Sequence, residues 1–204
     1  MSQRLSFTLI FTVVLVAAIS IVEFSAAPTI PSVQAQTPAM QTPADGYTVH
    51  VTAPHVVNGK VMGPFHHFCK VMSGDPKIVC QIYDSADPNA TMTQLEWIYA
   101  KKLVRPAVAL DTWNRNWHDH EVEIATGRVQ VLDLPADKAK EVADLVATTD
   151  GLIYSFTMKD GIPTGSMTIP QAVGHKAMTA EDYKKSGGGA AKAKADTAKK
   201  EMKH

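Results

Sequence analysis

The alternation of apolar and polar residues predicts strands from residue 47 onward. In YTVHV (47–51), tyrosine and valine take every second position, with threonine and histidine between them, which is the pattern of a half-buried strand. An Asn-Gly pair at 58–59 indicates a tight turn between apolar residues. FHHFCKVM (65–72) and KIVCQIYD (77–84) lie on either side of SGDP and predict the two strands of a hairpin.

Two segments carry apolar residues at helical spacing. NATMTQLEWIYAKKLV (89–104) has an apolar stripe and two overlapping capping-box patterns, so it predicts a helix that ends before Pro106. PADKAKEVADLVATT (135–149) has one narrow apolar face behind a proline suited to the first turn of a helix. Gly151 is expected to stop this second helix.

The remaining segments complete the predicted fold. Residues 111–134 predict a loop followed by two strands that turn at the Thr-Gly pair 126–127. LIYSFTM (152–158) predicts a strand, and SMTIPQ (166–171) predicts a short last strand after a turn. Strands and helices are mixed without a regular strand–helix repeat. The sequence therefore predicts a single α+β domain over residues 47–183, with an antiparallel or mixed sheet and helices packed on it.

The first 35 residues have the pattern of an export signal. Arg4 supplies a positive head, and the apolar run 5–22 carries no charge. The residues VQA, directly before Gln36, suit cleavage at that point. Retention of the run as a membrane anchor is the alternative, since its length is at the lower limit for a span. We therefore expect an exported protein, periplasmic or secreted, that is membrane-anchored if the signal is kept. A Pro-rich linker follows at 36–46.

Charge is unevenly distributed, although the formal net charge of the chain is zero. Residues 184–204 hold seven lysines against one aspartate and one glutamate, a net charge of +5. Residues 36–183 hold 12 basic and 17 acidic residues, a net charge of −5. The sequence of the body offers no basic stripe for phosphate groups, which argues against nucleic-acid binding. The Lys/Ala-rich tail is expected to be disordered, and contact with anionic lipid or polymer of the cell envelope is its alternative role.

The two cysteines of the chain face each other if the predicted hairpin turns at Gly74-Asp75. In that register Cys69 lies opposite Cys80. In an exported protein a disulfide between them is the natural expectation. A disulfide would prevent Cys69 from binding a metal as a thiolate or acting as a nucleophile. Both states of Cys69, bonded and free, remain open on the sequence alone.

Histidines gather in the motifs FHHFC and WHDH. On a strand, His118 and His120 point to the same side, which is a common way to present two imidazoles to a metal ion, whereas neighbouring His66 and His67 point to opposite sides. A carboxylate such as Glu121 could complete a site. The alternative is that these are buried histidines bonded to backbone or carboxylate groups. The candidate ligands for a transition metal such as zinc or copper are His66, His67, Cys69, Glu96, His118 and His120.

Catalytic fingerprints are missing from the sequence. It contains no Gly-x-Ser-x-Gly elbow, phosphate-binding loop or dinucleotide-binding motif. Trp113, Arg115, Trp117 and Asp119 collect beside the second histidine pair and could line a small-molecule pocket. Anchoring of a loop by buried tryptophans is the favoured interpretation. Catalytic residues are therefore unassigned, and an enzyme is the less favoured class.

Several motifs, taken in order, resemble the oil body-associated protein family, which is also classed as a domain of unknown function. The motifs are PFHHFCKVM with VCQIYDS, QLEWIYAKKL, WHDHEVEIATGRV and LIYSFTMKDGIPTGS, and the resemblance spans residues 47–172. The matching positions are His66, His67, Cys69, Cys80, Tyr83, Asp84, Ser85, Glu96, His118, His120, Glu123 and Gly127.

The resemblance implies association with seed oil bodies in plant members, without an agreed catalytic activity. It also weakens the expectation of a disulfide, because cytosolic relatives would keep both cysteines reduced and leave Cys69 available as a ligand. This chain departs from the plant members in its export segment and its lysine-rich tail, so the oil-body role is not carried over. The favoured function is an exported binding or structural protein of the cell envelope. The alternative is a His-rich metal-binding protein or metal-dependent enzyme that uses His67, His118 and His120 with another of the candidate ligands.

Overall fold

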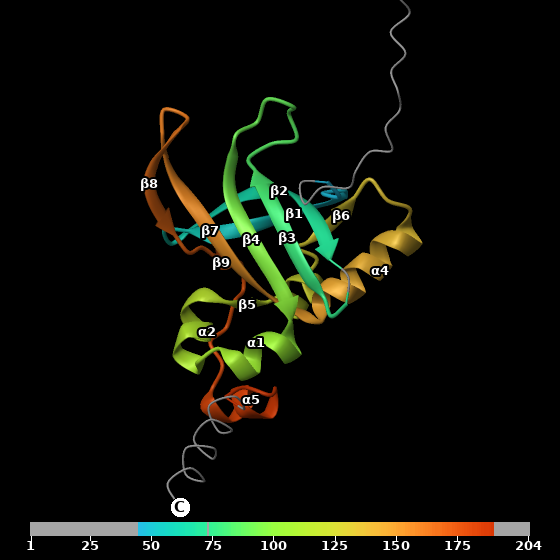
Figure 1. Cartoon of the computed structure of the whole chain (residues 1–204), viewed down its shortest axis with the longest axis vertical. Helices are drawn as coiled ribbons and strands as arrows, with labels where there is room; N and C mark the ends of the chain where they lie inside the picture. The colour runs from blue at the N-terminus through green and yellow to red at the C-terminus, as the bar shows by residue number, and fades with distance from the viewer. Residues whose placement is uncertain (1–44, 73, 190–204) are drawn as a thin grey trace, which may run out of the picture. The chain divides into compact units, whose positions relative to one another are not determined.

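The computed structural model describes residues 45–72 and 74–189 as a curled sheet with accompanying helices (Figure 1). The predicted signal segment 1–35 and the tail from residue 190 lie outside the described residues. Within the described part, no helix combines the length and the hydropathy needed to cross a membrane.

The described residues form nine strands and five helices. The strands are β1 (Val49–Val57), β2 (Lys60–Met72), β3 (Lys77–Tyr83), β4 (Met92–Ala100), β5 (His118–Asp119), β6 (Gln130–Leu132), β7 (Thr149–Lys159), β8 (Ile162–Thr168) and β9 (Gln171–Ala172). The helices are α1 (Lys101–Ala107), α2 (Leu110–Asn116), α3 (His120–Ala125), α4 (Ala136–Ala147) and α5 (Ala180–Lys185).

Antiparallel pairing runs through the whole sheet. The strand order is β5-β7-β4-β3-β2-β1-β6, with β8 paired to β7 and β9 paired to β1. The first four strands form a meander that contains the predicted turn at 58–59 and the predicted hairpin. This architecture confirms the α+β prediction and identifies the sheet as antiparallel.

Helix α3 joins the two ends of the sheet. Strands β5 and β6 end the strand order on opposite sides, yet only α3 and a short turn at Gly127 separate them in the sequence. Such a short link requires the sheet to curl, and the twist between neighbouring strands supplies curvature. Helix α4 packs against α3. It also packs against β6, and Figure 1 shows the two next to each other. The two helices therefore cover part of the concave face.

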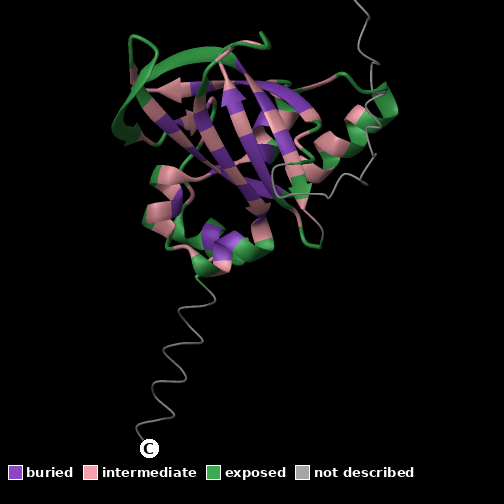
Figure 2. Ribbon diagram, turned by 45° about the horizontal axis from the view of Figure 1, so that its top comes forward, coloured by how far each residue is buried: buried purple, intermediate pink, exposed green. Residues whose placement is uncertain are grey.

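The main apolar core lies on that concave face. Alternate residues of the long strands point inward, and Figure 2 shows the buried positions repeating along them. Helix α4 contributes Val146 from the apolar side predicted for 135–149, although no residue of α4 is fully buried. The buried members of this core are Val51, Phe65, Cys69, Ile78, Cys80, Ile82, Ile98 and Ile153.

A second, smaller apolar cluster lies between α1, α2 and α5 (Figure 1). Trp113 is at its centre with 1% of its surface exposed, and it packs against Tyr183. The Tyr183 hydroxyl group contacts the main-chain carbonyl oxygens of Arg105 and Val108 at 3.1 and 2.8 Å. Trp113 thus anchors its segment, as the favoured interpretation predicted. Helix α5 extends the fold to Lys185, two residues past the predicted boundary.

The predicted helix over 89–104 is wrong for most of its length. Residues 92–100 form β4, which pairs with β3 on one side and with β7 on the other, and only 101–107 are helical. Every second residue of β4 from Gln94 to Ala100 is buried. Burial in this segment therefore follows the two-residue repeat of a strand rather than the spacing of a helix. Pro106 lies inside α1 rather than after its end.

Three other boundaries also differ from the predictions. Residues 111–134 contain α2, β5 and α3, and the Thr-Gly pair at 126–127 connects α3 to β6 rather than two strands. Gly151 lies inside β7, and α4 ends four residues earlier, at Ala147. Strand β8 begins at Ile162 and takes up four of the seven residues, 159–165, in which the turn was predicted. Helices α2 and α3 and strand β5 are too short for hydrophobic periodicity to identify them reliably.

Cys69 and Cys80 form a disulfide that links β2 to β3. The two residues are register partners in the hairpin, with Cα atoms 4.0 Å apart, which is the pairing the hairpin predicted. Both side chains are buried in the main core. The sulfur of Cys69 is therefore bonded, as the register and the expected export favoured, and it is not available as the ligand that the family resemblance left open.

The disulfide predicts a measurable stabilisation without a role in metal binding. The double variant Cys69→Ala/Cys80→Ala frees a loop with a sequence separation of 11 residues. Loop-closure entropy then predicts a free energy of unfolding lower by about 2–3 kcal/mol in urea titrations. Metal content should be unchanged. Loss of bound metal in a variant that remains folded would contradict the assignment of both sulfurs to the disulfide.

Candidate metal centre

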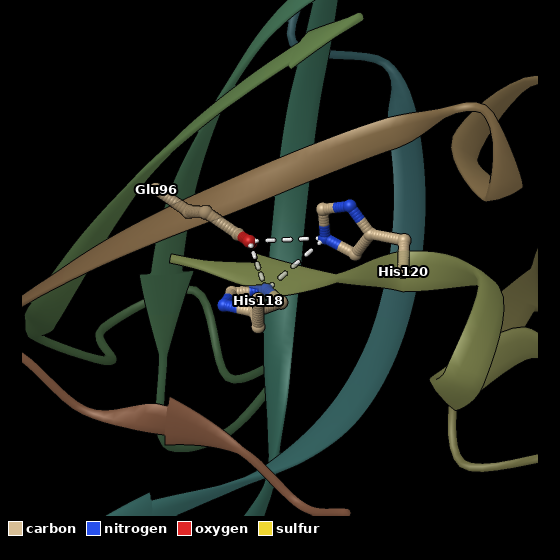
Figure 3. A group of neighbouring side chains, drawn as sticks. All are labelled: Glu96, His118 and His120. Atoms are coloured by element: carbon tan, nitrogen blue, oxygen red, sulfur yellow. Dashed lines mark hydrogen bonds and ion pairs between the residues drawn. The ribbon is translucent and has the colours of Figure 1, made fainter. Parts of the chain in front are cut away.

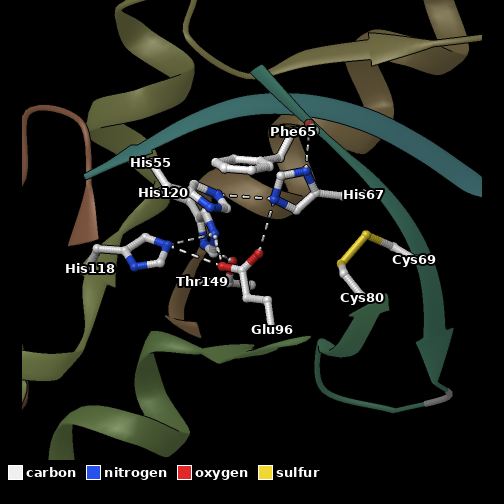
Figure 4. Close-up of a disulfide and its surroundings, with 9 residues drawn as sticks. All are labelled: His55, Phe65, His67, Cys69, Cys80, Glu96, His118, His120 and Thr149. Atoms are coloured by element: carbon white, nitrogen blue, oxygen red, sulfur yellow. Dashed lines mark hydrogen bonds and ion pairs between the residues drawn. A yellow bond between two sulfur atoms is a disulfide. The ribbon is translucent and has the colours of Figure 1, made fainter. Parts of the chain in front are cut away.

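Four histidines and two glutamates converge on the concave side of the sheet. They come from β1, β2, β4 and β5 and from the first turn of α3, and each has at most 4% of its surface exposed. Figure 4 shows most of this group with side chains directed toward one another, next to the disulfide. The six residues are His55, His67, Glu96, His118, His120 and Glu123.

Three atoms of this group form a compact triangle (Figure 3). Glu96 Oε1 lies 3.1 Å from His118 Nε2 and 3.2 Å from His120 Nε2, and the two nitrogens are 3.3 Å apart. Ligands at zinc–nitrogen distances of ~2.0–2.1 Å in a tetrahedron are separated by about 3.3–3.4 Å. The triangle therefore has the dimensions of one face of a tetrahedral zinc site.

The triangle has room to form because β7 carries a glycine beside it. Gly151 pairs with His118 of β5 and with Ile98 of β4. A Cβ atom at Gly151 would come closer than 3.0 Å to Glu96 Oε1, to His118 Nε2 and to the ring of His120. Any larger residue at this position would place carbon where the three ligand atoms converge.

Further donors surround the triangle. The second carboxylate oxygen of Glu96, Oε2, lies 3.8 Å from His67 Nε2, which in turn lies 3.1 Å from His55 Nε2 (Figure 4). Glu123 Oε2 lies 3.7 Å from His118 Nε2. Glu96 thus stands between two pairs of imidazoles, with one oxygen toward each pair.

The outer nitrogens of two imidazoles donate to oxygen acceptors. His67 Nδ1 donates to the main-chain carbonyl of Phe65 at 3.1 Å, and His55 Nδ1 donates to Gln94 Oε1 at 2.7 Å. Each of these rings, when neutral, therefore carries its proton on Nδ1 and presents a lone pair on Nε2. Metal-binding histidines are commonly oriented by this kind of outer hydrogen bond.

His120 is held in the same tautomer by a hydroxyl group. Thr149 Oγ1 donates its proton to the carbonyl oxygen of Val146 at 2.5 Å and therefore accepts from His120 Nδ1 at 2.9 Å. In the neutral ring His120 Nε2 therefore has a lone pair available for a metal ion, and in the protonated ring Nε2–H donates to Glu96 Oε1 at 3.2 Å. His118 differs, because its buried Nδ1 has no hydrogen-bond partner among residues 45–72 and 74–189.

Burial and mutual contact set the protonation of the group. Burial acts to raise the pKa of Glu96, but hydrogen bonds from His118 and His120 outweigh it and hold that pKa well below its ordinary value. Burial lowers the pKa of His55 to about 3 and also lowers the pKa of His67. Burial also acts to lower the pKa of His120, but hydrogen bonding to Glu96 outweighs it and raises that pKa. Glu96 is therefore a fixed negative charge, and His55 and His67 are neutral at pH 7.

An ionic cluster beside the centre fixes the segment 118–120. Arg105 donates to both carboxylate oxygens of Asp150, at 3.0 and 2.8 Å, and to Asp119 Oδ2 at 2.8 Å. Trp113 Nε1 adds a hydrogen bond to Asp150 Oδ2 at 2.9 Å. Burial acts to lower the pKa of Arg105, but Asp150 outweighs it, so that pKa is raised. The guanidinium group therefore joins β7 to β5 as a permanent charge.

Asp119 is the point at which this cluster meets the centre, because it lies between the two histidines of the triangle. It pairs with Lys101 of α1 at 2.7 Å and accepts from the main-chain N–H of Glu121 at 2.9 Å, which caps α3. Burial acts to raise the pKa of Asp119, but the hydrogen bond from Lys101 leads the contacts that lower it. These contacts fix where β5 ends and α3 begins.

An apolar cavity of about 50 Å³ adjoins the centre. All six residues of the histidine–glutamate group line it, together with side chains of the concave face and of α4. A small molecule in this space would touch apolar walls and the imidazole and carboxylate groups at once. The apolar lining includes Val49, Val51, Val129, Val131, Val142 and Val146.

The structure brings together four of the six predicted ligands, namely His67, Glu96, His118 and His120. It excludes the other two. His66 points to the opposite face of the sheet, where its Nδ1 lies 2.9 Å from His50 Nε2, because neighbouring residues of a strand alternate. Cys69 is bonded to Cys80. The alternative carboxylate Glu121 is exposed and pairs with Lys101.

Sequence reasoning missed two members of the group. His55 continues the inward series of residues 49, 51 and 53 in β1, but the predicted strand stopped at residue 51. Glu123 lies three residues after His120, on the same side of α3, and was noted only through the family resemblance. A longer first strand and a helix beginning at His120 were the two signals that would have identified them.

The chain matches a family of proteins of unknown function and is similar to a plant protein. A family model described as "Protein of unknown function (DUF1264)" matches residues 41–203. Oil body-associated protein 1B from Arabidopsis thaliana is 32% identical over 111 residues, which is 53% of this chain and 45% of the plant protein. The matched region therefore spans less than half of that relative. No solved structure matches the chain.

The ionic cluster should be essential for stability. Asp150→Ala would leave the buried Arg105 without its bidentate partner, and removing one partner of a buried pair costs about 3–5 kcal/mol. Asp144→Ala is the matched control, because it breaks the exposed pair with Lys140 and should cost less than about 1 kcal/mol. Urea unfolding of both variants measures the difference. Equal losses would show that the buried cluster does not hold β5 and β7 together.

Proposed function

The chain belongs to the DUF1264 family of proteins of unknown function, and from the geometry of its buried side chains we propose that it binds a transition-metal ion. The ligands are Glu96 Oε1, His118 Nε2 and His120 Nε2. The observation that carries the proposal is their triangle, whose edges of 3.1, 3.2 and 3.3 Å match those of a tetrahedral site.

The donor set favours zinc or copper. Two imidazole nitrogens and one carboxylate oxygen suit these borderline ions, whereas magnesium and calcium prefer oxygen ligands alone. Glu123 lies beside the triangle, with its Oε2 3.7 Å from His118 Nε2, and burial raises the pKa of its carboxyl group above the ordinary value. A cation would stabilise the charged form of this group and balance the charge of Glu96.

A proton-bonded histidine network is the alternative to a metal site. In that arrangement protons shared with Glu96 would replace the ion, and the raised pKa of His120 is compatible with it. The position of Gly151 favours the metal, because this strand residue leaves open the point on which three ligand atoms converge. The outer hydrogen bond of His120 also aims its Nε2 at that point.

We further propose that the chain is exported and acts as a binding protein of the cell envelope. Support comes from the charged head and apolar run of residues 1–22 and from the disulfide, which is characteristic of oxidising compartments. The relative's name concerns oil bodies, and an export segment would place this chain elsewhere.

Metal content tests the proposed ion. Purified protein stripped with a chelator, reloaded with zinc and dialysed should retain zinc measurable by elemental analysis. His118→Ala and His120→Ala should each lose the ion at this position. Gly151→Ala should lose it as well, although every ligand remains, because the added methyl group occupies the point of convergence.

His66→Gln is the control for these variants, since His66 lies on the opposite face and should leave zinc content unchanged. Circular dichroism would verify that each variant is folded. Zinc retention equal to wild type in both His118→Ala and His120→Ala would refute the site.

Export predicts a specific mature N-terminus. N-terminal sequencing of protein recovered outside the cytoplasm should begin at Gln36, because small residues precede it at the positions that signal peptidase reads. Intact Met1 in the membrane fraction would identify an uncleaved anchor. Protein confined to the cytoplasm would refute export altogether.

A further inference from the structure

With the Gln94 oxygen facing His55 Nδ1, the contact between His55 and His67 is not an ordinary hydrogen bond between neutral rings. Their Nε2 atoms are 3.1 Å apart, yet the single proton of each neutral ring lies on Nδ1, where it is donated to Gln94 or to Phe65. The two rings are nearly perpendicular, at 84°, so the contact joins nitrogen to nitrogen rather than stacking faces. Two lone pairs therefore face each other in a buried site, and a cation between them would turn this repulsion into attraction.

A second histidine pair in the same two strands shows what an ordinary contact looks like. On the opposite face, His50 Nε2 lies 2.9 Å from His66 Nδ1, and His50 Nδ1 contacts Asp133 at 2.6 Å. Asp133 accepts the proton of His50, which leaves its Nε2 free to accept from His66 Nδ1. In this pair one ring donates and the other accepts, so no cation is required.

The carboxylate of Glu96 extends from the first ion position toward the His55–His67 pair. Its Oε1 belongs to the triangle with His118 and His120, whereas Oε2 lies 3.8 Å from His67 Nε2 (Figure 4). A carboxylate can bind one cation through each oxygen. Glu96 is therefore placed between two groups of imidazole donors, each with two Nε2 atoms about 3 Å apart.

We propose that His55, His67 and Glu96 Oε2 hold a second transition-metal cation, so that Glu96 bridges a pair of ions. The proposal rests on the ion assigned above to Glu96, His118 and His120. The separation of 3.1 Å between the two Nε2 atoms is close to the distance of about 3.3–3.4 Å expected between ligands of one tetrahedral zinc ion. Glu96 Oε2 lies 3.8 Å from His67 Nε2, so this carboxylate oxygen has to move toward the two rings to complete the second position. All three residues are at most 3% exposed, and they border the apolar cavity.

A pair of ions gives the centre a chemical capacity that a single ion lacks. Two metals held close together can bind one small ligand from both sides, as in other two-metal sites. The cavity next to all six donors is where such a ligand would reach them. The class of cation is the same as at the first position, because the donors are again imidazole nitrogen and carboxylate oxygen.

Stoichiometry separates this inference from the proposed function. The wild-type protein should hold two zinc ions per chain after it has been stripped with a chelator, reloaded with zinc and dialysed. His55→Gln and His67→Gln should each hold one, whereas His66→Gln, from the opposite face, should hold two. One ion in wild type, with one also in His55→Gln and His67→Gln, would overturn the second position and leave the first intact. No zinc in wild type would refute both.

A measurement on the wild-type protein covers the case in which these variants fail to fold. Loading with two equivalents of Cu²⁺ should broaden the electron paramagnetic resonance spectrum, because two bridged ions lie close enough for their spins to interact. One equivalent should give the narrow spectrum of an isolated ion. A narrow spectrum at two bound equivalents would show that the ions are far apart and would overturn the bridging role of Glu96.

Discussion

The arrangement of side chains on the concave face of this sheet depends on one buried carboxylate, that of Glu96. Glu96 lies on β4, an interior strand of the sheet, with one oxygen toward His118 and His120 and the other toward His67. A carboxylate in an apolar interior is costly unless charged or hydrogen-bonding partners surround it. Here those partners come from the edge strand β5, from α3 and from β2, which is separated from β4 by β3. Their convergence on Glu96 depends on the curl of the sheet, because a flat sheet would hold these strands apart.

Two features other than the ligands position the ligand atoms around Glu96. Gly151 lets β5 approach β4 across β7, because a side chain there would collide with all three members of the triangle. The Arg105–Asp150 pair then fixes the segment 118–120 through Asp119. One feature provides space and the other provides orientation. The centre is therefore built as much by the residues around it as by its donors.

The disulfide determines which kinds of metal-binding donor remain on the concave face. Cys80 is the register partner of Glu96 across β3 and β4, so sulfur lies one strand away from the carboxylate. The bond to Cys69 removes both thiolates from the available donors. What remains is imidazole nitrogen and carboxylate oxygen, which favours zinc or copper over the soft ions that thiolates select. The donors themselves are buried, and an apolar cavity adjoins them.

Local patterns in the sequence were sufficient for the hairpin, the register that places Cys69 opposite Cys80, helix α4, the α+β class and the shared direction of His118 and His120. Each of these follows from residues close together in the chain, where alternation, turn residues and capping act directly. Strand β4 was predicted as a helix because its apolar residues fit both the spacing of a helix and the two-residue alternation of a strand. Only its pairing with β3 and β7 decided between these two structures. The same is true of the centre. Whether His66 or His67 would join His118 and His120, and that His55 and Glu123 lie beside them, depended on the curl of the sheet. That curl is set by contacts between residues far apart in the sequence, which no local pattern records.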